Sequence, residues 1–303
     1  MTRYLALRID FFPSSWYHFF EVICNLKLSD ILVRDPFMLK VGDVYYLYGT
    51  KTRGIQLGFD VYKSRDLVEF EGPIPVLPPE NVTWSKRKNW APEVYPIGGR
   101  YYMFATFEHL DGTRGTWALV SDKPDGTFVP HSDGPLTPKD WLSLDGTLAF
   151  EDGKPYMIFC HEWLQVGNGE ILIMELSPDL THAVGEPKLL WKAGDASWVV
   201  PVNGDPRNMV TDGPFIYHRN GELLCLWSSF GADRDGGNSY AISYAVSPSG
   251  SLFGPWEQSN KFISTVDAGH GMIFQDLDGK DRLIVHTPND HETAHPIFAD
   301  FEI

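Results

Sequence analysis

The chain has 303 residues, 43% of them hydrophobic and 14% aromatic, and carries a formal net charge of −15. Nucleic acids and anionic membranes bind basic surfaces, so this charge argues against both as partners and favours a neutral ligand such as a carbohydrate. The 28 Gly and 22 Pro predict a globular, turn-rich protein with many short strands.

The first 25 residues contain the apolar run WYHFFEVIC, but charged residues interrupt any signal-peptide core and no small-residue cleavage site follows. We therefore expect no secretion signal and a cytoplasmic protein. No run of about 18 apolar residues occurs, so no segment is expected to span a bilayer. Residues 1–25 are interpreted as an N-terminal extension and residues 26–303 as one domain. Cys24, Cys160 and Cys225 lack disulfide or metal-site spacing, which predicts reduced and mostly buried thiols.

From residue 34 onward one pattern returns five times: a small or polar pair, a short strand, a glycine-containing turn and a second strand. Asn-Gly and Asp-Gly between alternating apolar runs are strong signals for a β-hairpin, because these residues accept the positive φ of a tight turn. The five segments are RDPFMLKVGDVYYLYGT from Arg34, WAPEVYPIGGRYYMFATF from Trp90, LDGTLAFEDGKPYMIFCHEW from Leu144, TDGPFIYHRNGELLCLWSSF from Thr211 and GHGMIFQDLDGKDRLIVHTP from Gly269.

Further strand-like runs follow the first four hairpins, so each unit resembles a four-stranded propeller blade. The final PIFADFEI is a candidate for an outer or closing strand. The sequence thus predicts an all-β fold, a single five-bladed β-propeller with four-stranded blades. The equivalent positions are taken to be Asp35, Ala91, Asp145, Asp212 and His270, with spacings of 56, 54, 67 and 58 residues.

The first strand of each propeller blade lines the central channel, so residues at one end of these strands converge. We therefore expect three carboxylates, from Asp35, Asp145 and Asp212, to meet His270. Clustered carboxylates repel one another, which raises the pKa of at least one and provides the acid and base that glycoside hydrolysis requires. For any single Asp the alternative is a turn cap at the start of a strand.

The motifs RDPF, WAPEV, LDGTLAFEDGKPYM, DGPFIYHRNGELLCLWSS and GHGMIF resemble the successive blade entrances of glycoside hydrolase family 43. This family comprises five-bladed inverting arabinofuranosidases, arabinanases and xylosidases, and the resemblance runs from about Leu28 to Ile303. It implies that Asp35 is the base that activates water and that Asp145 modulates the pKa of the acid. The family has a Glu as the acid in the fourth blade, where this chain has Asp212.

This departure leaves two assignments for the proton donor. Asp is one methylene shorter than Glu, so the Asp212 carboxyl would lie about 1.5 Å farther from the glycosidic oxygen. In the first hypothesis, Glu162 of the motif CHEW donates the proton while Asp212 raises the pKa of Glu162 by repulsion. In the second, Asp212 donates the proton and Glu162 binds a sugar hydroxyl.

Aromatic rings near the blade entrances are candidates for sugar binding, because flat rings suit the apolar faces of sugars. Trp90 and Trp163 are the first candidates, whereas core packing explains Phe37 and Phe230 equally well. His270 matches the family's central histidine, which in several members holds a hydrated calcium ion. It is therefore a candidate for substrate binding or for water-mediated calcium binding. No organic cofactor is implied.

The resemblance implies an exo-acting enzyme that removes terminal α-L-arabinofuranosyl units from oligo- and polysaccharides with inversion. β-Xylosidase and endo-arabinanase activities are alternatives, because loops determine the shape of the rim. An alternative of another class is a carbohydrate-binding propeller that has lost catalysis through the change from Glu to Asp.

Overall fold

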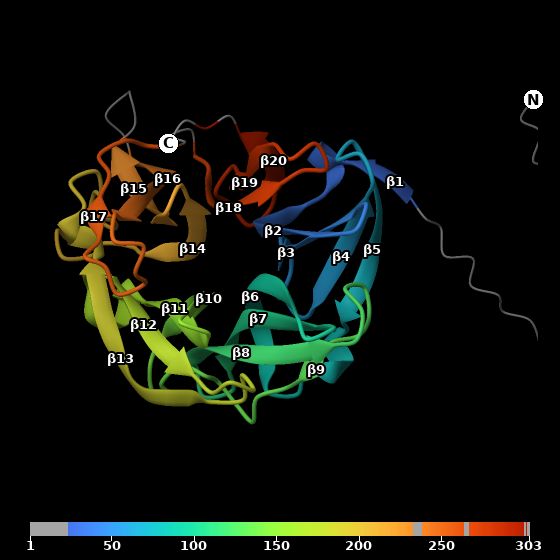
Figure 1. Ribbon diagram of the computed structural model, residues 1–303, viewed down its shortest axis with the longest axis horizontal. Coiled ribbons are helices and arrows are strands. Elements are labelled where there is room, and N and C mark those ends of the chain that lie inside the picture. Colours follow the sequence, from blue (N-terminus) through green and yellow to red (C-terminus); the bar gives the residue numbers. More distant parts are fainter. Residues whose placement is uncertain (1–23, 233–237, 264–266, 300, 302–303) are drawn as a thin grey trace, which may run out of the picture.

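Five antiparallel sheets stand in a ring in the computed structural model, which describes residues 24–232, 238–263, 267–299 and 301 (Figure 1). Each sheet is one blade, and the strands β2, β6, β10, β14 and β18 lie innermost in the ring. The predicted all-β, five-bladed propeller is confirmed.

Blades 2, 3 and 4 have four strands each, in sequence order from the inside outwards. Blade 2 consists of β6 (Ser85–Ile97), β7 (Arg100–His109), β8 (Arg114–Ser121) and β9 (Val129–Pro130). Blade 3 consists of β10 (Ser143–Glu151), β11 (Lys154–His161), β12 (Glu170–Leu176) and β13 (Ala183–Lys192). Blade 4 consists of β14 (Asp212–Arg219), β15 (Glu222–Ala232), β16 (Asn238–Ser247) and β17 (Glu257–Gln258).

Blades 1 and 5 depart from the predicted four strands. Blade 1 has five, because β1 (Cys24–Lys27) pairs with the outer edge of β5. Its other strands are β2 (Val33–Val41), β3 (Val44–Lys51), β4 (Phe59–Ser64) and β5 (Glu69–Leu77). Within the described residues blade 5 has three strands, β18 (Gly269–Gln275), β19 (Asp281–Thr287) and β20 (His295–Ala299). The predicted final strand is therefore the outer strand β20.

The predicted N-terminal extension, residues 1–25, falls almost entirely outside the described residues. Its last two residues belong to β1, which is part of blade 1.

Tight turns join the first two strands of the blades as their sequences predict. In blade 3 the turn residues Asp152 and Gly153 have φ of 52° and 76°, and in blade 4 Asn220 and Gly221 have φ of 50° and 88°. Two successive positive φ angles are what a two-residue hairpin turn requires, and Asn, Asp and Gly accept them at low cost. These turns fix the pairing register of each hairpin. The register in turn determines which polar residues face each other at the end of the hairpin opposite the turn.

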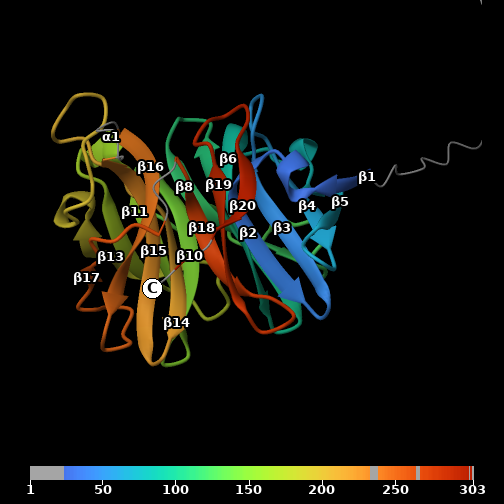
Figure 2. The ribbon, with the colours of Figure 1, turned by 90° about the horizontal axis from the view of Figure 1, so that it is seen from above.

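Helices are few and short in the described part of the chain. The single α-helix is α1 (Trp163–Val166), which lies on one face of the ring (Figure 2). Three 3₁₀ turns cover Leu28–Asp30, Pro79–Asn81 and Ala193–Asp195. None of the described helices is long and apolar enough to cross a membrane.

Apolar side chains fill the space between blades and part of the centre. The ring of Phe37 packs against Tyr95 at 5.5 Å and against Phe215 at 6.4 Å between centroids, which joins blades 1, 2 and 4. Cys160 and Cys225 are free and buried in the core between blades 3 and 4, as predicted. The side chain of Cys24 lies outside the described part.

Candidate active site

Every blade begins with the same irregularity in its innermost hairpin. One residue pairs with the second strand, the next has positive φ, and regular pairing resumes two residues later. The positive-φ residues are Asp35, Ala91, Asp145, Gly213 and His270, with φ between 43° and 57°. Such backbone is strained for residues other than Gly, and bulges of this kind aim side chains at functional sites.

This register corrects one of the predicted equivalences. Gly213, not Asp212, is the fourth-blade counterpart of Asp35 and Asp145, and Asp212 is the residue that pairs with Ser228 just before the bulge. The counterpart of Asp212 in blade 1 is therefore Arg34, which pairs with Thr50. Because of this offset, the Asp212 carboxyl starts one residue earlier than the other two.

All five blades line one cavity of about 500 Å³ at this end of the ring. A cavity of this size is typical of small-molecule sites. It contains eight of the nine predicted site residues, which are Asp35, Trp90, Asp145, Glu162, Trp163, Asp212, Phe230 and His270. Phe37 does not line it, because this ring is buried against Tyr95 and Phe215.

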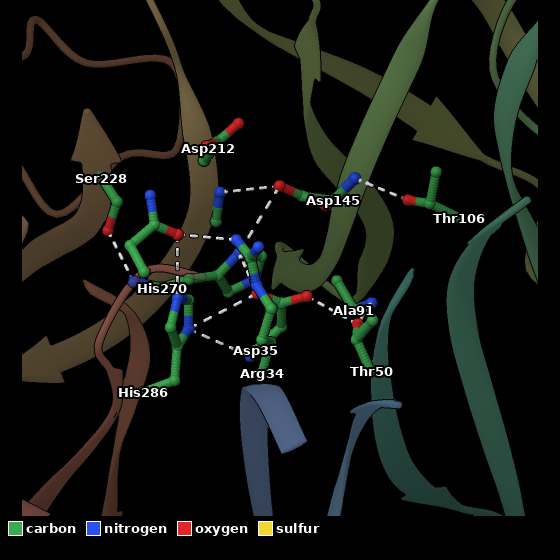
Figure 3. A network of polar contacts seen from close by, with 12 residues as sticks. Arg34, Asp35, Thr50, Ala91, Thr106, Asp145, Asp212, Ser228, His270 and His286 are labelled. Atoms are coloured by element: carbon green, nitrogen blue, oxygen red, sulfur yellow. Dashed lines mark hydrogen bonds and ion pairs between the residues drawn. The ribbon is translucent and has the colours of Figure 1, made fainter. Parts of the chain in front are cut away.

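Asp35 is a buried carboxylate held from several sides (Figure 3). The Thr50 hydroxyl donates to Asp35 Oδ2 at 2.6 Å, and His270 Nδ1 lies 3.3 Å from Oδ1. Burial raises the pKa of Asp35, but His270, the Arg34 guanidinium, His286 and the Thr50 hydroxyl outweigh it and lower the pKa to about 2. Asp35 is therefore an anion at neutral pH.

His286 supports the backbone of Asp35. Its Nδ1 accepts the Asp35 N–H at 3.2 Å, and its Nε2 lies 3.3 Å from Asn289 Oδ1, which also accepts from Arg34 Nη2 at 2.7 Å. Burial lowers the pKa of His286 to about 3, so the ring is neutral, with its proton on Nε2. This series of hydrogen bonds supports the positive-φ conformation of Asp35.

Asp145 and Asp212 are two carboxyl groups of the cavity that resist ionisation. Burial raises the pKa of Asp145 well above its usual range, and repulsion from Asp212 and Asp35 adds to the effect. Burial also raises the pKa of Asp212 to about 7, with Glu162 and Asp35 adding repulsion, although the Tyr240 hydroxyl donates to Asp212 Oδ2 at 3.0 Å. The site thus combines one firm anion with a carboxyl group that holds its proton near neutral pH.

Glu162 lies in the same cavity but is paired with a cation. Its Oε2 forms an ion pair with buried Arg114 Nη1, and Arg114 Nε lies 3.5 Å from Glu108 Oε2. Burial raises the pKa of Glu162, and Arg114 opposes that rise. Lys88 Nζ also contacts Glu108 Oε2, at 2.7 Å. Glu162 is therefore part of an extended ion-pair network.

Trp90 connects this network to the cavity. The guanidinium carbon of Arg114 lies 5.1 Å from the centroid of the ring, and Lys88 Nζ lies 5.7 Å from it. The indole N–H donates to Gln56 Oε1 at 2.8 Å. A ring held in this way is preorganised to present a flat face to a sugar.

The possible calcium site at His270 stays a prediction. The Nδ1 atom of His270 faces Asp35 Oδ1 and, at 3.7 Å, Asp145 Oδ2. Among the described residues, no group of three or more His, Cys, Asp or Glu side chains is arranged to hold a metal ion. Direct ligation by these side chains therefore does not fit.

Four important partners were not identified from the sequence. Thr50 and His286 lie near the ends of second strands, where the predicted hairpin registers could have placed them opposite the blade entrances. Arg114 and Tyr240 lie on the third strands β8 and β16, and nothing in the alternating pattern of a strand separates them from surface residues. Only the packing of one blade against the next brings them to the site.

Comparison with known proteins places this site in a family. The chain matches the sequence profile of Glycosyl hydrolases family 43 over residues 29–297. An endo-arabinase structure from Bacteroides thetaiotaomicron is 39% identical, covers 93% of this chain and 98% of that one, and superimposes with a TM-score of 0.84. The chain belongs to glycosyl hydrolase family 43.

Curated relatives are more distant. The Extracellular endo-alpha-(1->5)-L-arabinanase of Thermotoga petrophila is 28% identical over 257 residues, which cover 74% of this chain but 51% of that protein. The chain thus spans about half the length of this relative. The Extracellular exo-alpha-(1->5)-L-arabinofuranosidase ArbA of Cellvibrio japonicus is 24% identical and covers 88% of this chain and 81% of that protein.

These relatives contradict the expected cytoplasmic location. Four curated relatives are named as extracellular enzymes, which overturns the expectation of a cytoplasmic protein. The absence of a recognisable signal in the first 25 residues was therefore a poor guide to location.

Proposed function

We propose that this protein is an inverting glycoside hydrolase that cleaves α-(1→5)-linked L-arabinosyl units. The observation that carries the proposal is the divided ionisation of one carboxyl cluster: Asp35 has a pKa lowered to about 2 and Asp212 a pKa raised to about 7 in the same cavity. Inverting hydrolysis needs one carboxylate as base and one carboxylic acid as proton donor. The linkage is suggested by the names of the Thermotoga and Cellvibrio relatives.

In the proposed mechanism the reaction is a single displacement. Asp35 removes a proton from a water molecule, whose oxygen forms a bond to the anomeric carbon from one face of the sugar. The glycosidic bond breaks on the opposite face, and its oxygen takes the proton that Asp212 carries. Asp145 keeps its own proton, because burial and repulsion from Asp212 and Asp35 raise its pKa, and it interacts with both groups as the proposed modulator. The displacement requires no organic cofactor.

We assign proton donation to Asp212 in preference to Glu162. A general acid must hold a proton at the working pH, and the Asp212 carboxyl is stabilised in that form by burial and by neighbouring carboxylates. Burial also raises the pKa of Glu162, but the permanent positive charge of Arg114 opposes that rise and favours the carboxylate form. Glu162 is then suited to accept hydrogen bonds from sugar hydroxyls, beside Trp90 and Trp163.

Exo cleavage is the proposed mode, since residues of all five blades surround the cavity and favour a pocket that accepts a chain end. Endo cleavage is the second candidate, because relatives from Bacteroides thetaiotaomicron and Thermotoga petrophila carry endo-arabinanase names. The two modes differ in their first products. An exo enzyme releases arabinose from the start, whereas an endo enzyme first releases a ladder of oligosaccharides.

The test is hydrolysis of linear arabinan, arabinobiose, 4-nitrophenyl α-L-arabinofuranoside and 4-nitrophenyl β-D-xylopyranoside. Asp35→Ala should abolish turnover on all arabinosides. Asp212→Asn should lose far more activity on arabinobiose than on the nitrophenyl glycoside, because a good leaving group needs little protonation. Glu162→Gln should lower kcat/KM for both substrates to a similar extent, mainly by raising KM.

Three results would overturn parts of this proposal. The reverse pattern for the two acid variants would make Glu162 the donor. Preferential cleavage of the xyloside would show that the substrate is a β-xyloside and not an arabinoside. Binding of arabino-oligosaccharides without release of reducing sugar would identify a binding protein.

A further inference from the structure

Four of the five seams between blades carry the same hydrogen bond. The backbone N–H of the positive-φ residue donates to a side chain near the end of the second strand of the preceding blade (Figure 3). The bonds are Ala91 N to Thr50 Oγ1 at 2.8 Å, Asp145 N to Thr106 Oγ1 at 2.8 Å, His270 N to Ser228 Oγ at 2.8 Å and Asp35 N to His286 Nδ1 at 3.2 Å.

The seam between blades 3 and 4 departs from this pattern. Cys160 pairs with Leu144 at the same place in the register. It therefore stands where the other four blades carry Thr, Thr, Ser and His. A thiol is a weak acceptor compared with a hydroxyl or a neutral imidazole. Cys160 is buried, and burial raises the pKa of its thiol, so it is not an accepting thiolate.

The N–H of this seam has another acceptor. Gly213 N donates to Asp145 Oδ2 at 3.0 Å, so this bond runs to the Asp145 carboxyl group instead of to the preceding second strand. A side chain has no room at position 213, because a Cβ atom there would lie 2.7 Å from the His270 ring.

We propose that Cys160 is a positioning residue for Asp145. Because the thiol competes poorly for the Gly213 N–H, that donor holds the Asp145 carboxyl group next to the backbone of Asp212. A hydroxyl at position 160 would accept the N–H, as hydroxyls do at three other seams, and would release the Asp145 carboxyl group. The inference rests on the proposed role of Asp145 in hydrolysis.

The test compares two substitutions of nearly equal size, Cys160→Ser and Cys160→Ala, with turnover and unfolding measured for both. If the thiol only fills space, Ala should be at least as harmful as Ser, because it removes more volume. The proposal predicts the opposite order for turnover. Cys160→Ser should lose about tenfold or more in kcat, and Cys160→Ala about two- to threefold, since one hydrogen bond to a buried carboxyl group is at stake.

Matched variants keep the comparison informative. Cys225→Ser places a hydroxyl in the same buried core, and it should change unfolding but leave kcat as in the wild type. Cys160→Thr also places a hydroxyl acceptor at position 160, and Thr is well suited to a strand. This variant can be used if the Ser variant fails to fold. Ser and Ala variants with equal kcat, or an Ala variant with the lower kcat, would overturn the inference.

Failure of the proposed function would look different. Asp145→Asn should reduce kcat strongly if Asp145 acts in hydrolysis. A fully active Asp145→Asn variant would refute that role, and with it any need to position the carboxylate. If Asp145→Asn is inactive but Cys160→Ser and Cys160→Ala have equal kcat, only the positioning role of Cys160 is refuted.

Discussion

A buried carboxyl group in the centre of the ring, Glu93, should make the stability of the protein depend on pH. Tyr95 and Thr147 donate hydrogen bonds to it, yet burial dominates and raises its pKa from 4.5 to about 8. Between these values the folded protein keeps a proton that the unfolded chain has lost. The free energy of unfolding therefore falls as pH rises, by about 1.4 kcal/mol per pH unit and at most about 5 kcal/mol in total.

Glu93→Gln removes this titration while retaining size and an acceptor for the Tyr95 hydroxyl. Urea unfolding of both proteins in EDTA, from about pH 5 to about pH 9, should show wild-type stability declining relative to the variant. Taking the difference cancels the contributions of the other raised carboxyl groups. Glu257→Gln, on the exposed edge strand β17, is the control and should give a constant difference. A constant difference for Glu93→Gln as well would refute the reasoning from burial.

Three further predictions concern catalysis. Because the proposed mechanism requires a protonated Asp212, kcat/KM should fall above about pH 7. Tyr240→Phe should move this fall to higher pH by about half a pH unit or more, since the lost hydrogen bond favours the anion. An unmoved pH profile would exclude Asp212 as the titrating acid. Thr50→Val should lower kcat about tenfold, because the hydroxyl both donates to Asp35 and accepts the Ala91 N–H. Thr50→Ser keeps the hydroxyl and should retain most of the wild-type kcat. A Ser variant as impaired as the Val variant would contradict this account. Trp90→Ala should raise KM for arabino-oligosaccharides about tenfold with a smaller change in kcat, because the ring is expected to stack on the sugar. An unchanged KM would show that the ring only packs against Arg114.

The architecture could be predicted from local sequence because its determinants are local. Glycine-containing turns such as Asp152-Gly153 accept positive φ wherever they occur, and alternating apolar residues on both sides define strands. Five such hairpins at similar spacing suffice for a propeller, and the position of Asp35 and Asp145 at the strand starts follows from the same pattern. The family resemblance added the catalytic assignments, which composition and spacing alone do not contain.

Other features were decided by tertiary structure. A bulge changes register by one residue without changing composition, so the sequence alone made Asp212 the equivalent of Asp145 when Gly213 holds that place. The ion pair of Glu162 with Arg114 and the burial of Phe37 depend on how blades pack. The ionisation of each carboxyl group follows from burial and from neighbours on other blades, and a linear sequence specifies neither until the ring is assembled.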